Sequence, residues 1–420
     1  MMQETSLDVR DEVPCPFCGL VCDDLRIETK RLDVLANGCE ISRSGFASFN
    51  APKPDAPRIA GKTATLADAA AEAARRLRPS RQPVFGGLGT DVAGMRALLH
   101  LADRCGAVVD HMDSVFLMRN VLVLQDSGWL TTTLSEIKNR ADLLILAGTD
   151  ASRFPRFFER YVWNRDSLFE HGEREIIYLG RGLDAQAGVS PGGRKPEVIE
   201  CDTARIGELA GALRALAAGK TLQAGKIADV PQAVLQKLAS RMLKARYGVL
   251  VWSAADFDFP HAELAVQSLC ELIKDLNQTT RFSGFPLGGN EGSMTASQVC
   301  AWQSGYPARI SLGSGHPEYA PHFFSAARMD ADGADFLLWV SSFNPKRVPP
   351  ASQAPTVVLG CNGMAFKKEP DIYIPVATPG IDHSGHIFRT DNVVALRLCK
   401  LRESSLPSVA EAVSAIEKGF

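Results

Sequence analysis

Short apolar runs alternate with longer helical patterns along most of this chain. Each run is bounded by glycine, proline or polar residues, which is typical of a strand buried on both faces of a parallel sheet. The runs lie at residues 83–89, 143–149, 174–180, 247–253, 334–342, 355–361 and 371–377. Helical spacing of alanine and leucine occurs between them, at residues 65–78, 204–219, 230–245 and 263–277. This alternation favours right-handed βαβ units, so we predict an α/β fold with Rossmann-like parallel sheets.

The length of 420 residues exceeds what one hydrophobic core usually organises, so several domains are expected. A proline-rich polar stretch at 50–62 suggests a surface connection and a boundary near residue 58. The final residues, 406–420, have the pattern of an amphipathic helix. We therefore predict an N-terminal cysteine-motif domain (1–58), a discontinuous Rossmann-like domain (59–112 and 246–400), an inserted Rossmann-like domain (113–245) and a C-terminal helical tail (401–420).

The amino-acid composition argues against some classes of binding partner. Apolar residues make up 45% and charged residues 22% of the chain, and the formal net charge is −2. This balance lacks the basic excess that nucleic-acid binding would predict. The sequence also has no basic N-terminal segment leading into an apolar run and no run of about 20 apolar residues. We expect no nucleic acid, no membrane and a cytoplasmic location.

Four of the ten cysteines lie close together near the N-terminus. Cys15, Cys18 and Cys22 have the spacing C-x2-C-x3-C, and Cys39 follows sixteen residues after them. Four thiolates spaced in this way can hold a [4Fe-4S] cluster or a tetrahedral zinc ion, and a metal-free loop is a third alternative. The spacing alone does not decide between them. The other six cysteines are scattered, and we expect them to be small buried apolar side chains.

Other motifs favour structural roles. The segment "GGLGTDVAG", 86–94, resembles a phosphate cradle but lacks the third glycine of G-x-G-x-x-G, so we predict a turn. The loop "LGGNEG", 287–292, is predicted to be a shaped loop. Asp382, His383 and His386 contain the only H-x-x-H pair, too few ligands for zinc. His316 and His322 are judged in the same way. No G-x-S-x-G elbow, Walker loop or H-E-x-x-H helix is present.

Several segments, in the same order, resemble the B subunit of formylmethanofuran dehydrogenase, a member of the molybdopterin oxidoreductase superfamily. They are "CPFCGLVCDDL" with "NGCEISRSGF", "LSEIKNRADLLILAGTDASRFPRFFERY", "GGNEGSMTASQVCAWQSGYPARISLGSGHPEY" and "TPGIDHSGHIFRTDN". In redox members the resemblance implies a [4Fe-4S] cluster on the N-terminal cysteines. It also implies a tungsten or molybdenum ion on pterin cofactors, ligated by a cysteine or selenocysteine in a Val-Cys-His-Gly-Pro type segment.

The stretch that corresponds to this ligand segment is "DSVFLMRNVLVLQDSG", 113–128. Phe116 stands at the predicted position of the metal-ligating cysteine, and Leu117 stands at that of the histidine. Neither side chain can coordinate a metal or transfer a proton. We therefore predict no catalytic residue and no molybdopterin or tungsten in this chain.

This departure points to the related formyltransferase/hydrolase complex of methylotrophs. There the resemblance implies that the B subunit is non-catalytic and that its partners are an amidohydrolase-like A subunit, a C subunit and a formyltransferase D subunit. The assembly would move a formyl group from formyl-tetrahydromethanopterin to a methanofuran analogue and release formate. The alternative is a redox-active molybdopterin/[4Fe-4S] dehydrogenase subunit. The chain ends shortly after "RTDNVVALRLCKL", so we also predict that the superfamily's C-terminal β-barrel domain is absent.

Overall fold

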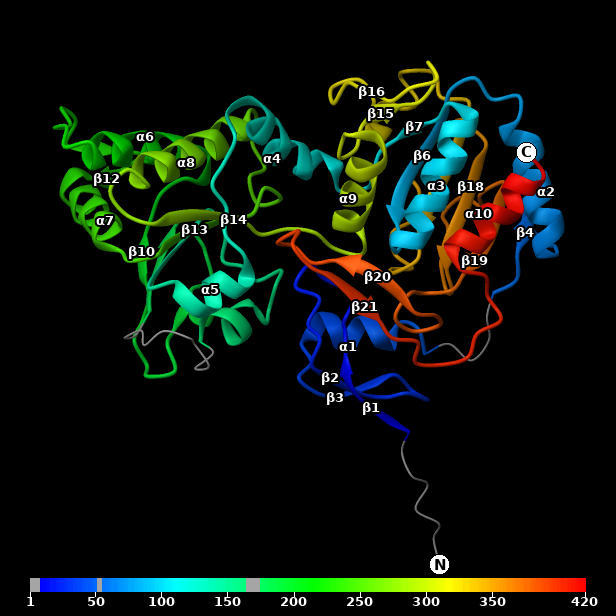
Figure 1. Ribbon diagram of the computed structural model, residues 1–420, viewed down its shortest axis with the longest axis horizontal. Helices are drawn as coiled ribbons and strands as arrows, with labels where there is room; N and C mark the ends of the chain where they lie inside the picture. The colour runs from blue at the N-terminus through cyan, green and yellow to red at the C-terminus, as the bar shows by residue number, and fades with distance from the viewer. Residues whose placement is uncertain (1–7, 51–54, 164–173) are drawn as a thin grey trace, which may run out of the picture. The chain divides into compact units, whose positions relative to one another are not determined.

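The computed structural model describes residues 8–50, 55–163 and 174–420. It divides into two compact units, one containing residues 1–114 and 289–420 and the other residues 115–288. Part of the predicted linker, 51–54, and part of the predicted inserted domain, 164–173, lie outside the described residues. Mixed α/β architecture with parallel sheets is present in both units, which confirms the predicted fold class at this level (Figure 1).

The first unit is built on a nine-stranded sheet with the order β16-β15-β7-β6-β17-β18-β19-β4-β5. The five strands from β7 to β19 in this order are parallel, and the remaining pairings are antiparallel. The strands are β4 (Arg58–Ile59), β5 (Lys62–Thr63), β6 (Pro83–Gly89), β7 (Val108–Val109), β15 (Ile310–Ser311), β16 (Glu318–Tyr319), β17 (Phe336–Ser341), β18 (Thr356–Cys361) and β19 (Ile372–Val376). Every residue of β6, β17 and β19 is buried, as expected for central parallel strands.

One face of this sheet is covered by helices. They are α2 (Leu66–Leu77), α3 (Val92–Cys105), α9 (Ser293–Ser304) and α10 (Val409–Lys418). Figure 1 shows α3 and α10 side by side, and α10 also contacts α2. A single apolar core joins these helices to the sheet, because α10 buries Val409, Val413 and Ile416 on its inner face.

The N-terminal segment of the first unit forms a small antiparallel sheet of β1 (Val9–Val13), β2 (Leu25–Glu28) and β3 (Asp33–Ala36), followed by α1 (Glu40–Ala47). A separate hairpin is formed by β20 (Gly385–Phe388) and β21 (Ala395–Leu398), and a short 3-10 helix by Ala326–Arg328. The predicted domain 1–58 and the predicted tail 401–420 both belong to this unit. The packing of α10 on α2 and α3 explains why the tail is not separate.

The second unit contains a five-stranded, fully parallel sheet with the order β10-β9-β8-β13-β14. Its strands are β8 (Leu143–Ala147), β9 (Glu175–Leu179), β10 (Glu197–Ile199), β13 (Gly248–Trp252) and β14 (Phe282–Pro286). Its helices are α4 (Ser114–Ser127), which starts at the boundary, α5 (Leu134–Arg140), α6 (Ile206–Ala217), α7 (Gln232–Lys244) and α8 (Ala262–Leu276). Shorter elements are the hairpin β11 (Lys226–Ile227) and β12 (Val230–Pro231), a π-helical turn (Phe158–Val162) and 3-10 turns (Gln186–Gly188, Thr203–Arg205).

The boundary between the units differs from the predicted one. We assigned residues 246–400 to the first Rossmann-like domain, but residues 246–288 belong to the second unit. The reason is strand pairing, because β13 lies between β8 and β14 and forms parallel ladders with both. Within the described residues, no helix is long and apolar enough to cross a membrane.

Candidate functional site

Residues 14–24, called the cysteine loop below, connect β1 to β2. Hydrogen bonds within the loop's own backbone close it. The amide of Cys15 donates to the carbonyl oxygen of Cys22 (2.8 Å), and the amide of Val21 donates to the carbonyl oxygen of Cys18 (3.1 Å). Val21 has a φ of 44°, in the left-handed region that a β-branched residue rarely adopts. The loop therefore turns back tightly and brings three buried thiols together: those of Cys15, Cys18 and Cys22.

Cys39 joins this group from the first turn of α1. It is the N-cap residue: the amide of Ser42 donates to its Sγ (3.5 Å), and its own amide donates to Ser42 Oγ (2.8 Å). This reciprocal pair is a capping box, a role that serine or threonine usually fills. The thiol is half-buried. Cys39 thus has a structural role that does not depend on a metal.

The electrostatics show that the four thiols form one group. Burial raises the pKa of Cys15 well above its usual value, and the charges of Cys18, Cys22 and Cys39 raise it further. Burial is also the main cause that raises the pKa of Cys18 to about 12. Backbone amides act in the opposite direction, that of Phe17 on Cys15 and those of Leu20 and Val21 on Cys18. Without a cation, the thiols of Cys15 and Cys18 are therefore protonated at neutral pH.

The four cysteine thiols are chemically suited to bind a metal group, but they are not spaced to surround a single metal ion. A zinc ion requires sulfur ligands at about 2.3 Å. In the described part of the chain, no three Cys, His, Asp or Glu side chains are arranged so that they could hold a metal ion. An iron–sulfur cluster is larger and is held by four cysteines whose sulfurs accept amide hydrogen bonds. The donor set thus matches the ligands of either group, and the arrangement does not decide between them.

Space next to the cysteine loop is small. A cavity of about 10 Å³, enough for one water molecule, is lined by Cys18 and Gly19 on one side and by the loop 289–292 on the other. A pterin dinucleotide needs a pocket of several hundred cubic ångströms. This cavity therefore offers such a cofactor no room.

The glycine-rich loops 86–90 and 289–292 pack against each other. A Cβ on Gly292 would lie 2.6 Å from the carbonyl oxygen of Thr90, and one on Gly89 would lie 3.1 Å from that of Glu291. Asp91 occupies the N-terminus of α3, where its Oδ1 accepts from the amide of Gly94 (3.0 Å). A phosphate at that position would meet a carboxylate. These contacts agree with the predicted structural roles of both loops and do not fit a pyrophosphate cradle.

Phe116 and Leu117 lie in the first turn of α4, and both side chains are half-buried. The guanidinium of Arg119 lies over the Phe116 ring, 5.4 Å from its centroid. Arg119 Nη1 donates to the carbonyl oxygen of Ala254 (2.6 Å), which fixes the cation in place. The pair is a cation–π contact, and neither member is a metal ligand.

The predicted histidine candidates do not assemble into a site. Asp382 accepts from the amide of Thr378 (2.9 Å) and from Nε of Arg402 (2.7 Å), so it braces the loop after β19. His383 Nδ1 is 2.9 Å from the carbonyl oxygen of Ser384, and His386 is exposed. His316 and His322 are also exposed. These positions support the structural roles predicted for them.

One buried pair that the sequence did not reveal resembles a nucleophile and its base. Ser297 Oγ lies 3.1 Å from His111 Nε2. However, the amide of Asp113 donates to His111 Nδ1 (3.2 Å), which assigns the ring proton to Nε2. Ser297 Oγ donates to the carbonyl oxygen of Ser293 (3.1 Å) and accepts from the histidine. Burial and then Arg309 lower the pKa of His111 to about 3, so its imidazole is a weak base. Because Nε2, the nitrogen that faces Ser297, already carries the ring proton, it does not accept the serine proton.

The fold and this site define a two-unit α/β protein with an N-terminal four-cysteine motif and, among the described residues, no side-chain cluster spaced to hold a metal ion. The chain is similar in sequence to known proteins. The chain is 28% identical over 415 residues to the B subunit of the tungsten-containing formylmethanofuran dehydrogenase 2 of Methanocaldococcus jannaschii, covering 91% of each chain. It is 28% identical over 337 residues to the B subunit of the formyltransferase/hydrolase complex Fhc of Methylorubrum extorquens, covering 76% of this chain and 85% of that protein.

A solved structure extends the comparison to three dimensions. A chain of the formyltransferase/hydrolase complex FhcABCD from Methylorubrum extorquens, crystallised with methylofuran, matches with a TM-score of 0.72 and 26% identity. The match covers 86% of this chain and 98% of that one. No protein-family model matches the chain. The chain is therefore a homologue of the B subunits of these two enzyme complexes.

Proposed function

We propose that this chain is the B subunit of a formyltransferase/hydrolase complex. The complex would move a formyl group from formyl-tetrahydromethanopterin to a methanofuran analogue and release formate. The observation that carries the proposal is the match to the FhcABCD chain, which extends over nearly the whole of that chain with a TM-score of 0.72. Its partners would be the amidohydrolase-like A subunit, the C subunit and the formyltransferase D subunit.

The chain would have no molybdenum or tungsten centre of its own. Phe116 and Leu117 support this, because neither side chain at the predicted ligand position can bind a metal. The mutual packing of the loops 86–90 and 289–292 adds support, because each fills the space in which the other would approach a cofactor. The fold would then be a molybdopterin-oxidoreductase-like one. The sparse cysteines accord with a cytoplasmic location.

We infer that the four N-terminal cysteines hold a [4Fe-4S] cluster in preference to zinc. Cys15, Cys18, Cys22 and Cys39 would be its ligands, with amides of the cysteine loop and of Ser42 directed at the sulfurs. Such a cluster supplies electron transfer where a redox partner exists. In a chain without a second redox centre, these residues would hold the cluster as a structural link between the cysteine loop and α1.

The proposal is tested by assembly. The chain is expressed from its own genome with an affinity tag and purified under mild conditions. We expect the A, C and D subunits to co-purify in constant ratio, and the preparation to release formate from formyl-tetrahydromethanopterin when the methanofuran analogue is present. Purification without these subunits, or with iron–sulfur electron-transfer subunits of a dehydrogenase, would contradict it.

A further inference from the structure

The chain crosses between its two units twice. It leaves the first unit after Ser114 and returns to it at Gly289. Both crossing points lie beside charged residues of the first unit: Asp113 comes one residue before Ser114, and Glu291 comes two residues after Gly289. The two connections are residues 112–117 and 286–293. How far they can move depends on how firmly the first unit holds them.

Arg347 binds both connections at once. Its Nε lies 3.0 Å from Glu291 Oε2, and its Nη2 lies 3.4 Å from Asp113 Oδ1. The two carboxylates are largely buried, with 16% of the Asp113 side chain and 13% of the Glu291 side chain exposed. Asn344 Nδ2 also donates to Glu291 Oε1 (2.6 Å). One planar guanidinium therefore links two segments that are 178 residues apart in sequence.

The arginine is itself fixed to the sheet. It follows β17, and its carbonyl oxygen accepts from the indole Nε1 of Trp339 within that strand (2.8 Å). On the first connection, Nε and Nη2 of Arg309 lie 3.3 and 3.2 Å from Ser114 Oγ. Arg347 is thus tied to strand β17, and Arg309 directly precedes strand β15, so both anchoring residues lie next to strands of the first unit.

The second connection carries backbone strain. Glu291 has a φ of 46°, and it lies between Gly289 (φ 76°) and Gly292 (φ 87°). A non-glycine residue in this region is strained and persists only where its surroundings hold it. The contacts of Glu291 with Arg347 and Asn344 are those surroundings. Without them, the segment can relax to another conformation.

We propose that Asp113, Arg347 and Glu291 form a clamp that fixes both connections to the first unit and so restricts the motion of the second unit about them. Linked domains move relative to each other by default, and hinge positions are loop or element-terminal residues. The clamp limits that motion at the two places where it must occur. It depends on no bound ligand, and it does not depend on the proposed function.

The clamp is tested with Arg347→Gln in the full chain, purified with its partner subunits. The matched control is Arg328→Gln, since Arg328 forms an exposed ion pair with Asp332 in the same unit, away from both crossings in sequence. Hydrogen exchange is measured by mass spectrometry. We expect residues 112–117 and 286–293 to exchange about tenfold faster in Arg347→Gln and to be unchanged in the control. Unchanged exchange in either segment would overturn the proposal.

A second measurement reports on the motion itself. Spin labels are introduced through non-natural amino acids at the exposed positions Lys62 and Lys237, one in each unit, because the native cysteines exclude thiol labelling. We expect a wider distribution of label separations in Arg347→Gln than in the parent and control chains. Identical distributions would overturn the proposal. If Arg347→Gln does not fold, the double variant Asp113→Asn/Glu291→Gln replaces it with the same expected outcomes.

Discussion

Asp110 follows β7, and its carboxylate is buried beside Arg309. Its Oδ2 accepts from the amide of Ala326 (2.8 Å), whereas Oδ1 has no hydrogen-bond partner among the described residues and lies 3.7 Å from Arg309 Nε. Burial raises the pKa of Asp110 from 3.8 to about 6, although Arg309 opposes the shift. The fold thus favours the neutral carboxyl group. This contribution to stability is complete below pH 4 and is lost as the pH rises through 6.

We predict that Asp110→Asn removes this pH dependence. The free energy of unfolding of the parent, minus that of the variant, should fall by about 3 kcal/mol between pH 4 and pH 7, because the shift spans roughly two pKa units. Urea unfolding at a series of pH values measures the difference and cancels the carboxylates common to both chains. A constant difference, or one that rises with pH, would contradict the argument.

Residue spacing in the sequence predicts the cysteine group, but it does not predict the contacts between distant segments. The cysteines were recognisable because three of them lie within eight positions, and the structure brings Cys39 into the same electrostatic group. The pair of Asp110 and Arg309, and the clamp around Arg347, join segments about 50 to 230 residues apart. No local spacing connects such residues, since only the folded sheet brings them together.

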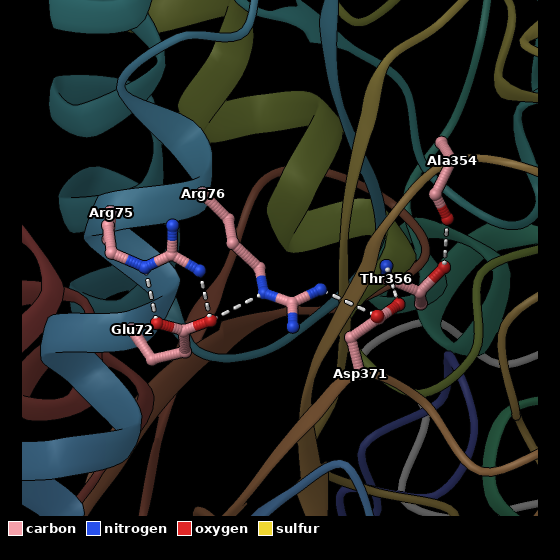
Figure 2. A network of polar contacts seen from close by, with 6 residues as sticks. All are labelled: Glu72, Arg75, Arg76, Ala354, Thr356 and Asp371. Carbon is pink, nitrogen blue, oxygen red and sulfur yellow. Dashed lines mark hydrogen bonds and ion pairs between the residues drawn. The ribbon is translucent and has the colours of Figure 1, made fainter.

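At the scale of elements, a charged network joins α2 to the beginnings of strands β18 and β19 (Figure 2). Arg76 Nη1 donates to Asp371 Oδ1 (2.6 Å), and Asp371 Oδ2 accepts from the amide of Thr356 (2.9 Å). Within the helix, Glu72 accepts from both Arg75 and Arg76, which lowers its pKa to about 2. Arg76 therefore connects the helix to a strand terminus, whereas the drawn contacts of Arg75 stay within the helix.

We predict that Arg76→Gln lowers the free energy of unfolding by about 0.5–1 kcal/mol, since a partly exposed ion pair and its hydrogen bond are lost. The matched variant Arg75→Gln should have a smaller effect, because it keeps the link between α2 and Asp371. Equilibrium unfolding at neutral pH compares the two. Equal losses would show that the link to the sheet adds nothing to the contact within the helix.

The strands that the sequence predicts are those that form long apolar runs because both of their faces are buried. The runs that predicted β8, β9, β13, β17, β18 and β19 are continuous apolar segments, because both faces of these strands are covered. By contrast, β14 has the sequence FSGFP and β7 has two residues, and neither gives an apolar run. Without β14, nothing in the sequence placed β13 in the second sheet, which explains the misplaced boundary at residue 245.

At the scale of the whole molecule, the chain combines two ordered α/β units with a four-cysteine motif and lacks residues that could perform the chemistry of a dehydrogenase at the predicted ligand position. The chain is homologous to B subunits of both a dehydrogenase and a formyltransferase/hydrolase complex. Homology alone therefore does not choose between these two assignments, and the chemistry of the site must do so. Phe116 and Leu117 are the basis on which our proposal chooses between the two, because neither side chain at the predicted ligand position can bind a metal.

The most direct test is the cofactor content of the purified complex together with its reaction. We predict no molybdenum, tungsten or pterin by elemental and fluorescence analysis, about four iron atoms per chain, and release of formate without reduction of a viologen dye. Stoichiometric molybdenum or tungsten, or formyl-dependent reduction of the dye, would contradict the central claim that this chain is a non-catalytic subunit.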